Sequence, residues 1–186
     1  MNPIKNKKDL ETTIDDIRNF AYLYLEKYSS SKQQLRTYLF KKLIKKKQKI
    51  SSKKEIFNLI DTVIFSLVDQ KFLSDEYYSD AKSKAFLRRG YSLNKIRYNL
   101  IKRGIDEKYI KASISKIKEN ESDPDFFSAI KICKRRRIGP CREESNRPLF
   151  YKKDISILAR SGFSYEISKK VLEIPKKEFK KFCTML

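Results

Sequence analysis

Three tight groups of carboxylates are the residues of this chain with the most obvious capacity for chemistry. Paired carboxylates can hold Mg²⁺ for phosphodiester hydrolysis, so a metal-dependent nuclease is one hypothesis. Each group, however, falls where a helix is predicted to begin, and acidic side chains there cap backbone N–H groups and complement the helix dipole. We therefore expect capping, and neither a catalytic nor a metal site, at Asp15-Asp16, Asp75-Glu76 and Asp123/Asp125.

Other groups that could support catalysis are scarce. Histidine is absent, which removes the usual imidazole base and metal ligand, and no G-x-x-x-x-G-K loop for nucleotide phosphates is present. Cys133, Cys141 and Cys183 are odd in number and show no C-x-x-C spacing, so reduced thiols are expected rather than a disulfide framework. The sequence predicts a protein that needs no cofactor and is not an enzyme.

Basic residues dominate the charge of the chain. Lys and Arg number 44 against 23 Asp and Glu, a formal net charge of +21 at pH 7. A potential of this sign attracts nucleic acids and acidic protein surfaces, and guanidinium groups bind phosphate and carboxylate oxygens in bidentate fashion. The candidate contact residues are Arg88, Arg89, Arg97, Lys102 and Arg103, together with Arg135, Arg136, Arg137 and Arg142.

Residues 88–105, RRGYSLNKIRYNLIKRGI, allow two interpretations: a helix that reads DNA bases, or a helix that packs in the core. Its Arg and Asn residues could address base edges from a helix lying in the major groove of DNA. Its Leu93, Ile96 and Leu100 recur at helical spacing, however, as core residues do. We favour packing over base readout here, and we also expect a core role rather than a stacking role for the aromatic residues Tyr77, Tyr78, Phe86 and Tyr98.

Apolar residues recur at three- and four-residue steps along nearly the whole chain, without sustained two-residue alternation, so an all-α fold is predicted. Ser52, Ser74, Ser92, Asp106 and Asp123 are expected helix caps. The expected helices are 13–28, one after the serines 29–31, one from 52, 74–90, 92–103, 106–120, one from 124, 152–160, 164–172 and one after 175, with 133–148 mostly loop.

Similar segments recur at intervals of about sixty residues. SKQQLRTYL from Ser31 aligns with SLNKIRYNL from Ser92, and LIKRGI from Leu100 aligns with LARSGF from Leu158. Three short helices bury little surface alone, so tandem units of this kind share faces. The prediction is an elongated array of three three-helix repeats, at 13–72, 73–122 and 123–186, after a flexible polar leader at 1–12.

The third repeat is predicted to contain a basic insertion at about 134–148. Ala21 and Leu39 lie 18 residues apart, and Ala81 and Leu100 lie 19 apart. The corresponding separation between Ala129 and Leu158 is 29. The insertion is a candidate contact element, because exposed loops often carry binding residues, although a solvated surface loop is the commoner explanation of such a run.

Membrane and secretion signals are missing. No run of about 18 apolar residues occurs, and the N-terminal residues lack the apolar segment of a signal peptide. We expect a soluble, monomeric, cytoplasmic protein with no membrane partner.

The segment FLSDEYYSDAKSKAFLRRGYSLNKIRYNLIKRGI, residues 72–105, resembles the RecX family of RecA regulators. Residues 18–39 and 158–172 resemble the family's first and last repeats. The resemblance implies a protein that lodges in the groove of a RecA filament on DNA, touches its phosphates, and limits RecA ATP hydrolysis, strand exchange and SOS co-protease activity. The alternative is a general basic DNA- or RNA-binding helical module without RecA specificity.

Overall fold

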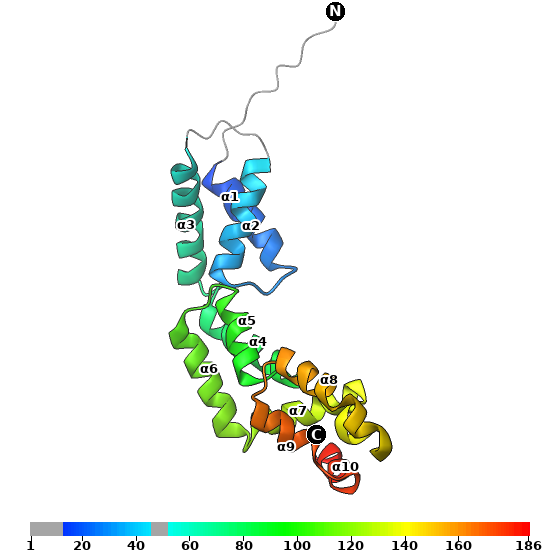
Figure 1. The fold of residues 1–186 in the computed structure, drawn as a ribbon. Coiled ribbons are helices and arrows are strands. Elements are labelled where there is room, and N and C mark those ends of the chain that lie inside the picture. Colours follow the sequence, from blue (N-terminus) through cyan, green and yellow to red (C-terminus); the bar gives the residue numbers. More distant parts are fainter. Residues whose placement is uncertain (1–12, 46–51) are drawn as a thin grey trace, which may run out of the picture. The chain divides into compact units, whose positions relative to one another are not determined.

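The structure, a computed structural model, describes residues 13–45 and 52–186, and every regular element in these ranges is helical (Figure 1). The all-α prediction is confirmed. None of the described helices is long and apolar enough to cross a membrane. The α-helices are α1 (Ile14–Leu25), α2 (Lys32–Lys45), α3 (Lys53–Asp69), α4 (Asp75–Arg88), α5 (Leu93–Ile101), α6 (Glu107–Asn120), α7 (Pro124–Arg136), α8 (Arg147–Arg160), α9 (Tyr165–Leu172) and α10 (Lys176–Thr184).

The chain divides into two compact units, with the division between Tyr78 and Ser79. In the first unit α1, α2 and α3 pack pairwise around one apolar core (Figure 1). Ile17, Leu39 and Ile60 in this core are fully buried. Each such side chain stabilises the fold by about 1.5–3 kcal/mol through removal of apolar surface from water.

The second unit contains most of α4 and all of α5 to α10. Helix α5 packs on α6, while α9 packs on both α7 and α8, and α10 packs on α7. The main apolar cluster of this unit comes from the last four helices and the segment before α8. Its fully or almost fully buried members are Ala129, Ile130, Ile132, Cys133, Leu158 and Val171.

The order of helices agrees with three successive sets, α1–α3, α4–α6 and α7–α9, followed by α10. Leu39, Leu100 and Leu158 lie in the second helix of each set, and all three are fully buried. The repeat boundaries at 72/73 and 122/123 stay a prediction, and the leader at 1–12 lies outside the described residues.

The predicted caps are mostly confirmed. The hydroxyl groups of Ser52 and Ser92 accept hydrogen bonds from the N–H groups three residues later, and Asp123 accepts one from Phe126. Ser74 does the same for Tyr77 at 3.2 Å. Asp106 occupies the expected position before α6, but its side chain makes no capping hydrogen bond.

The predicted loop at 133–148 is correct for 137–146, which contain no α-helix, and wrong at both ends of the range. Helix α7 continues to Arg136, and two short 3₁₀ turns follow at Gly139–Cys141 and Glu144–Asn146. Helix α8 then begins at Arg147, five residues before the expected start. Pro148 suggested a break, but proline is accepted in the first turn of a helix, where its missing N–H has no partner to lose.

One repeat position in α4 also needs correction. Ala21 and Ala129 are fully buried, but Ala81, which the alignment paired with them, is exposed. The buried small residues of α4 are Ser79 and Ser83. The repeat alignment paired Ala81 with Ala21 and Ala129 because the residue types match. Burial in α4, however, requires a small side chain and not alanine in particular.

Candidate interaction surface

Arginine side chains from three helices gather at the C-terminal end of α4. Arg88 and Arg89 are exposed there. The guanidinium group of Arg135, in α7, donates a hydrogen bond to the carbonyl oxygen of Arg89 at 2.8 Å. Arg103, which follows α5, lies over the ring of Phe86 with its Cζ 5.0 Å from the ring centroid. We call Arg88, Arg89, Arg103 and Arg135 the arginine corner.

Close backbone contact explains why these residues meet. Gly90 ends α4 with a φ of +77°, and a Cβ atom added to it would lie 3.0 Å from the carbonyl oxygen of Ser128 and 3.2 Å from Cβ of Lys131. Only glycine combines this dihedral with so close an approach. The end of α4 therefore lies directly on α7, and residues that were assigned to the second repeat and to the insertion become neighbours.

Three further candidate residues extend the exposed basic surface. Lys102 follows the last turn of α5, and Arg136 and Arg137 stand at the end of α7. Arg137 has a left-handed backbone, with a φ of +52°; Lys71 is the other such non-glycine residue in the described ranges. Cations at a helix C-terminus also complement the helix dipole, so these three side chains help to stabilise the ends of α5 and α7.

Arg97 is partly neutralised. Its guanidinium group pairs with the carboxylate of Glu107 across α5 and α6 at 2.9 Å, where Arg97 is exposed and Glu107 is partly exposed. An exposed pair of this kind contributes at most about 1 kcal/mol, so a stronger anionic partner could replace Glu107.

Arg142 has a structural role. Its Nε and Nη2 atoms donate to the two carboxylate oxygens of Asp154 at 2.7 and 2.8 Å. The Asp154 side chain is only 2% exposed and also accepts the N–H of Gly139 at 2.9 Å. The guanidinium group in addition lies 4.3 Å from the ring centroid of Phe150. Arg142 therefore holds the segment before α8 to α8 itself.

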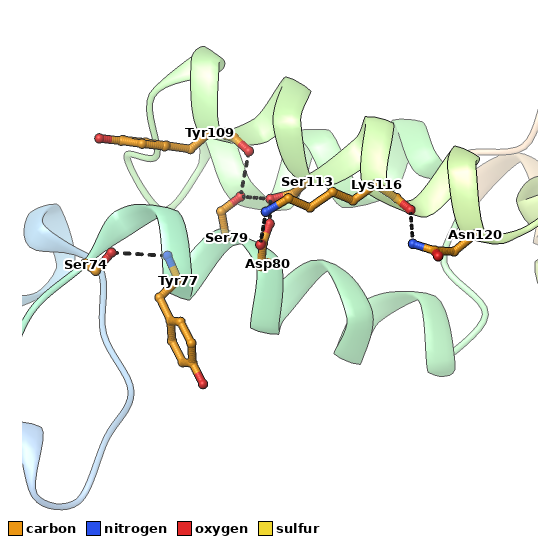
Figure 2. A network of polar contacts seen from close by, with 8 residues as sticks. All are labelled: Ser74, Tyr77, Ser79, Asp80, Tyr109, Ser113, Lys116 and Asn120. Carbon is orange, nitrogen blue, oxygen red and sulfur yellow. Dashed lines mark hydrogen bonds and ion pairs between the residues drawn. The ribbon is translucent and has the colours of Figure 1, made fainter.

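Sequence reasoning missed Asp154 and a second polar group between α4 and α6, shown in Figure 2. There the hydroxyl of Ser113 donates to Asp80 at 2.6 Å, and Lys116 donates to the other carboxylate oxygen at 2.5 Å. A signal was available, because Ser113 falls between Ile110 and Ile117 on the apolar stripe of α6. Asp154 likewise lies one helical turn before Leu158 on the buried side of α8.

The carboxylate groups lie at helix starts, as predicted. Asp16 and Thr13 form a reciprocal capping box on α1. Asp75 accepts the N–H of Lys32 at 2.9 Å, and Asp125 accepts that of Leu93 at 2.7 Å. An acid in the first turn of one helix set thus caps the second helix of the preceding set, which is a recurring contact of the repeats.

The three cysteines lie in α7, in the 3₁₀ turn after it and in α10, and all three thiols are free. Cys141 donates to the carbonyl oxygen of Cys133 at 3.5 Å. Burial raises the pKa of each thiol above its ordinary value, most strongly at Cys133. Raised pKa values keep these thiols protonated and unreactive near neutral pH.

The core role expected in residues 88–105 is confirmed for Ile96 and Leu100, which are fully buried, whereas Leu93 is only partly buried. The expectation for the aromatic residues was half right. Tyr78 and Phe86 are buried, but Tyr77 is 79% exposed and Tyr98 is 58% exposed. Both exposed tyrosines fall on the outer side of their helices.

Comparison with known proteins agrees with this description. No protein-family model matches the chain. The chain is 28% identical over 164 residues to "Regulatory protein RecX" of Myxococcus xanthus (strain DK1622), covering 84% of each chain. A crystal structure of RecX from Lactobacillus salivarius superposes with a TM-score of 0.61, at 18% identity, covering 90% of this chain and 97% of the other. A second crystal structure, of regulatory protein RecX, gives a TM-score of 0.57 at 19% identity, covering 87% and 74%.

The successive helix sets and their recurring caps define a helical-repeat protein. The resemblance noted in the sequence is confirmed: the chain is similar to a RecX regulatory protein in sequence and to two RecX crystal structures in fold.

Proposed function

We propose that this protein binds RecA filaments on DNA and lowers RecA ATP hydrolysis, strand exchange and SOS co-protease activity. The observation that carries the proposal is the similarity to a regulatory protein RecX over 84% of both chains. The protein acts as a monomer in the cytoplasm, and it works by binding rather than by catalysis.

The distribution of charge supports an anionic partner. Within Ser79–Leu186, the second compact unit, 28 Lys and Arg face 13 Asp and Glu. Opposite charge raises the rate of encounter with a polyanion such as a nucleoprotein filament.

The arginine corner, with Lys102, Arg136 and Arg137, is the surface we assign to the filament. Guanidinium groups that are already held in place lose less conformational freedom when they bind phosphate or carboxylate oxygens. Arg135 and Arg103 are held in this way by the Arg89 carbonyl group and the Phe86 ring.

Co-sedimentation with RecA filaments on single-stranded DNA tests this assignment. Replacing Arg88, Arg89, Arg135 and Arg136 by alanine should weaken binding by at least about tenfold, because hydrogen bonds to charged groups contribute about 1.5–3 kcal/mol each. The matched control removes the same charge from α10, at Lys176, Lys177, Lys180 and Lys181, and should bind almost as well as the parent.

Equal losses in the two variants would show that only net charge matters. Tight binding to naked duplex, with a log–log salt slope near −0.9 per phosphate contact and no preference for the filament, would favour the general nucleic-acid-binding alternative instead.

A further inference from the structure

Three strongly exposed aromatic rings surround one hollow in the first unit. Tyr28 is 58% exposed, Phe72 is 64% exposed and Tyr77 is 79% exposed. They line a pocket of about 390 Å³ between the end of α1 and the turn that joins α3 to α4. Exposed apolar side chains that cluster around one pocket are typical of a binding site.

Two of these rings are held in place by other aromatic residues. Phe72 meets Tyr22 edge to face, with ring centroids 5.6 Å apart. Tyr28 packs on Tyr24 at 5.1 Å, and Tyr24 in turn stacks on Tyr38 at 4.1 Å. The exposed faces are therefore positioned before any ligand arrives, which lowers the entropic cost of binding.

A lysine with unusual backbone conformation stands at the pocket rim. Lys71 has a φ of +61°, whereas the comparable helix ends at Gly90, Gly104 and Gly162 use glycine for positive φ. Left-handed backbone is strained for a residue that carries a Cβ atom. The chain thus keeps a cation beside the rings at a position where glycine would be more stable.

The positive charge of the pocket lining favours an anionic ligand. The lining combines the aromatic rings with Lys71 and three serines and contains no carboxylate. Three other hollows in the described part of the chain include acidic side chains, such as Asp123, Asp154 and Asp80. Aromatic faces beside a cation, without opposing acids, are how proteins hold single-stranded nucleic acids by base stacking.

We propose that this pocket binds an unpaired base of single-stranded DNA, stacked on Phe72 or Tyr77, with Lys71 on the neighbouring phosphate. The inference deepens the proposed function, on which it rests for its nucleic-acid partner, because it adds a subsite for bare single strand that lies on residues other than the arginine corner.

Fluorescence anisotropy with the full chain tests the proposal. The probes are a labelled oligothymidylate strand and an abasic strand of the same length, which has the same phosphates but no bases. The parent chain should bind oligothymidylate more tightly. Phe72→Ala and Tyr77→Ala should each weaken that binding by about 5- to 150-fold and leave abasic binding unchanged, since stacking contributes about 1–3 kcal/mol per base.

The chain offers a matched control and an internal reporter. Phe65→Ala removes a ring that is 76% exposed but lies outside the pocket, and it should not change affinity. Tyr77→Phe keeps a stacking face and should bind like the parent. The chain contains no Trp, so Tyr77→Trp supplies a single indole whose emission the oligothymidylate, but not the abasic strand, should quench.

Equal affinity of the parent chain for the two strands, or unchanged affinity in both alanine variants, would overturn the inference. So would variants that bind the free strand normally and lose only filament binding, because the pocket would then contact protein. If the parent binds oligothymidylate in the predicted way but leaves RecA activity unchanged, the base pocket stands and the proposed function fails.

Discussion

At the scale of single residues, local capping contacts could be predicted from the sequence, whereas the partners of buried polar side chains could not. Capping residues such as Ser92 and Asp123 could be predicted, because a cap and its N–H partner lie three residues apart. The partners of Asp154 lie 12 and 15 residues away across an irregular segment, where no periodic pattern relates them. The only indication in the sequence was the position of Asp154 on the apolar face of its helix, one turn before Leu158.

Replacing Asp154 by alanine should cost about 3 kcal/mol of stability. The change leaves the Gly139 N–H and a half-buried guanidinium group without their acceptor, and such losses are large when the lost partner is buried. Urea unfolding followed by circular dichroism gives the value. Asp106→Ala is the control, because that side chain makes no capping hydrogen bond, and its cost should stay within about 0.5 kcal/mol.

At the scale of helices, the sequence predicted the element type correctly and the helix ends imprecisely. The apolar periodicity and the caps located the helices from α1 to α7, since these signals are local. The start of α8 was misplaced because Gly139 and Pro140 suggested a loop, whereas the Arg142–Asp154 contact orders that segment as compact turns. The meeting of α4 and α7 at Gly90 could not be predicted, because it depends on tertiary packing.

The polar contacts between α4 and α6 predict a pH-dependent stability. Burial alone would raise the pKa of Asp80, but hydrogen bonds from Lys116 and Ser113 outweigh it and hold that pKa below its usual 3.8. A lowered pKa in the folded state means that the carboxylate stabilises the fold above pH 3.8 and loses this effect as the pH falls through the lower value.

Asp80→Asn should therefore cost about 1 kcal/mol at pH 7, a modest value because the Lys116 side chain is half exposed. The unfolding free energies of the parent and the variant should converge as the pH falls below 3.8 and through the lowered pKa of Asp80. Urea titrations across this range measure both. A constant difference at every pH would show that the Lys116 pair does not contribute in this way.

The left-handed end of α7 predicts a stabilising substitution. Arg137→Gly should raise stability by up to about 1 kcal/mol, because glycine adopts a φ of +52° without strain. Arg136→Gly, one residue earlier and still within the helix, should instead lower stability by about 0.5–1 kcal/mol. Thermal unfolding distinguishes the two, and a loss at Arg137 would mean that its side chain has a stabilising partner.

At the scale of the whole molecule, the order of motifs carried more information than any one of them. Leu39, Leu100 and Leu158 recur because each is the buried centre of the second helix of a set, and this order supported the RecX resemblance. Contact residues are harder to predict. Arg88 and Arg142 look alike in sequence, and only the structure shows that one is exposed while the other is bound to Asp154.

The most direct test of the central claim is RecA ATP hydrolysis on single-stranded DNA with increasing amounts of this protein. We predict that hydrolysis falls as the protein approaches the RecA concentration. The variant with Arg88, Arg89, Arg135 and Arg136 replaced by alanine should need at least about ten times more protein for the same effect. The α10 lysine variant should act like the parent. Unchanged hydrolysis at stoichiometric protein would contradict the account.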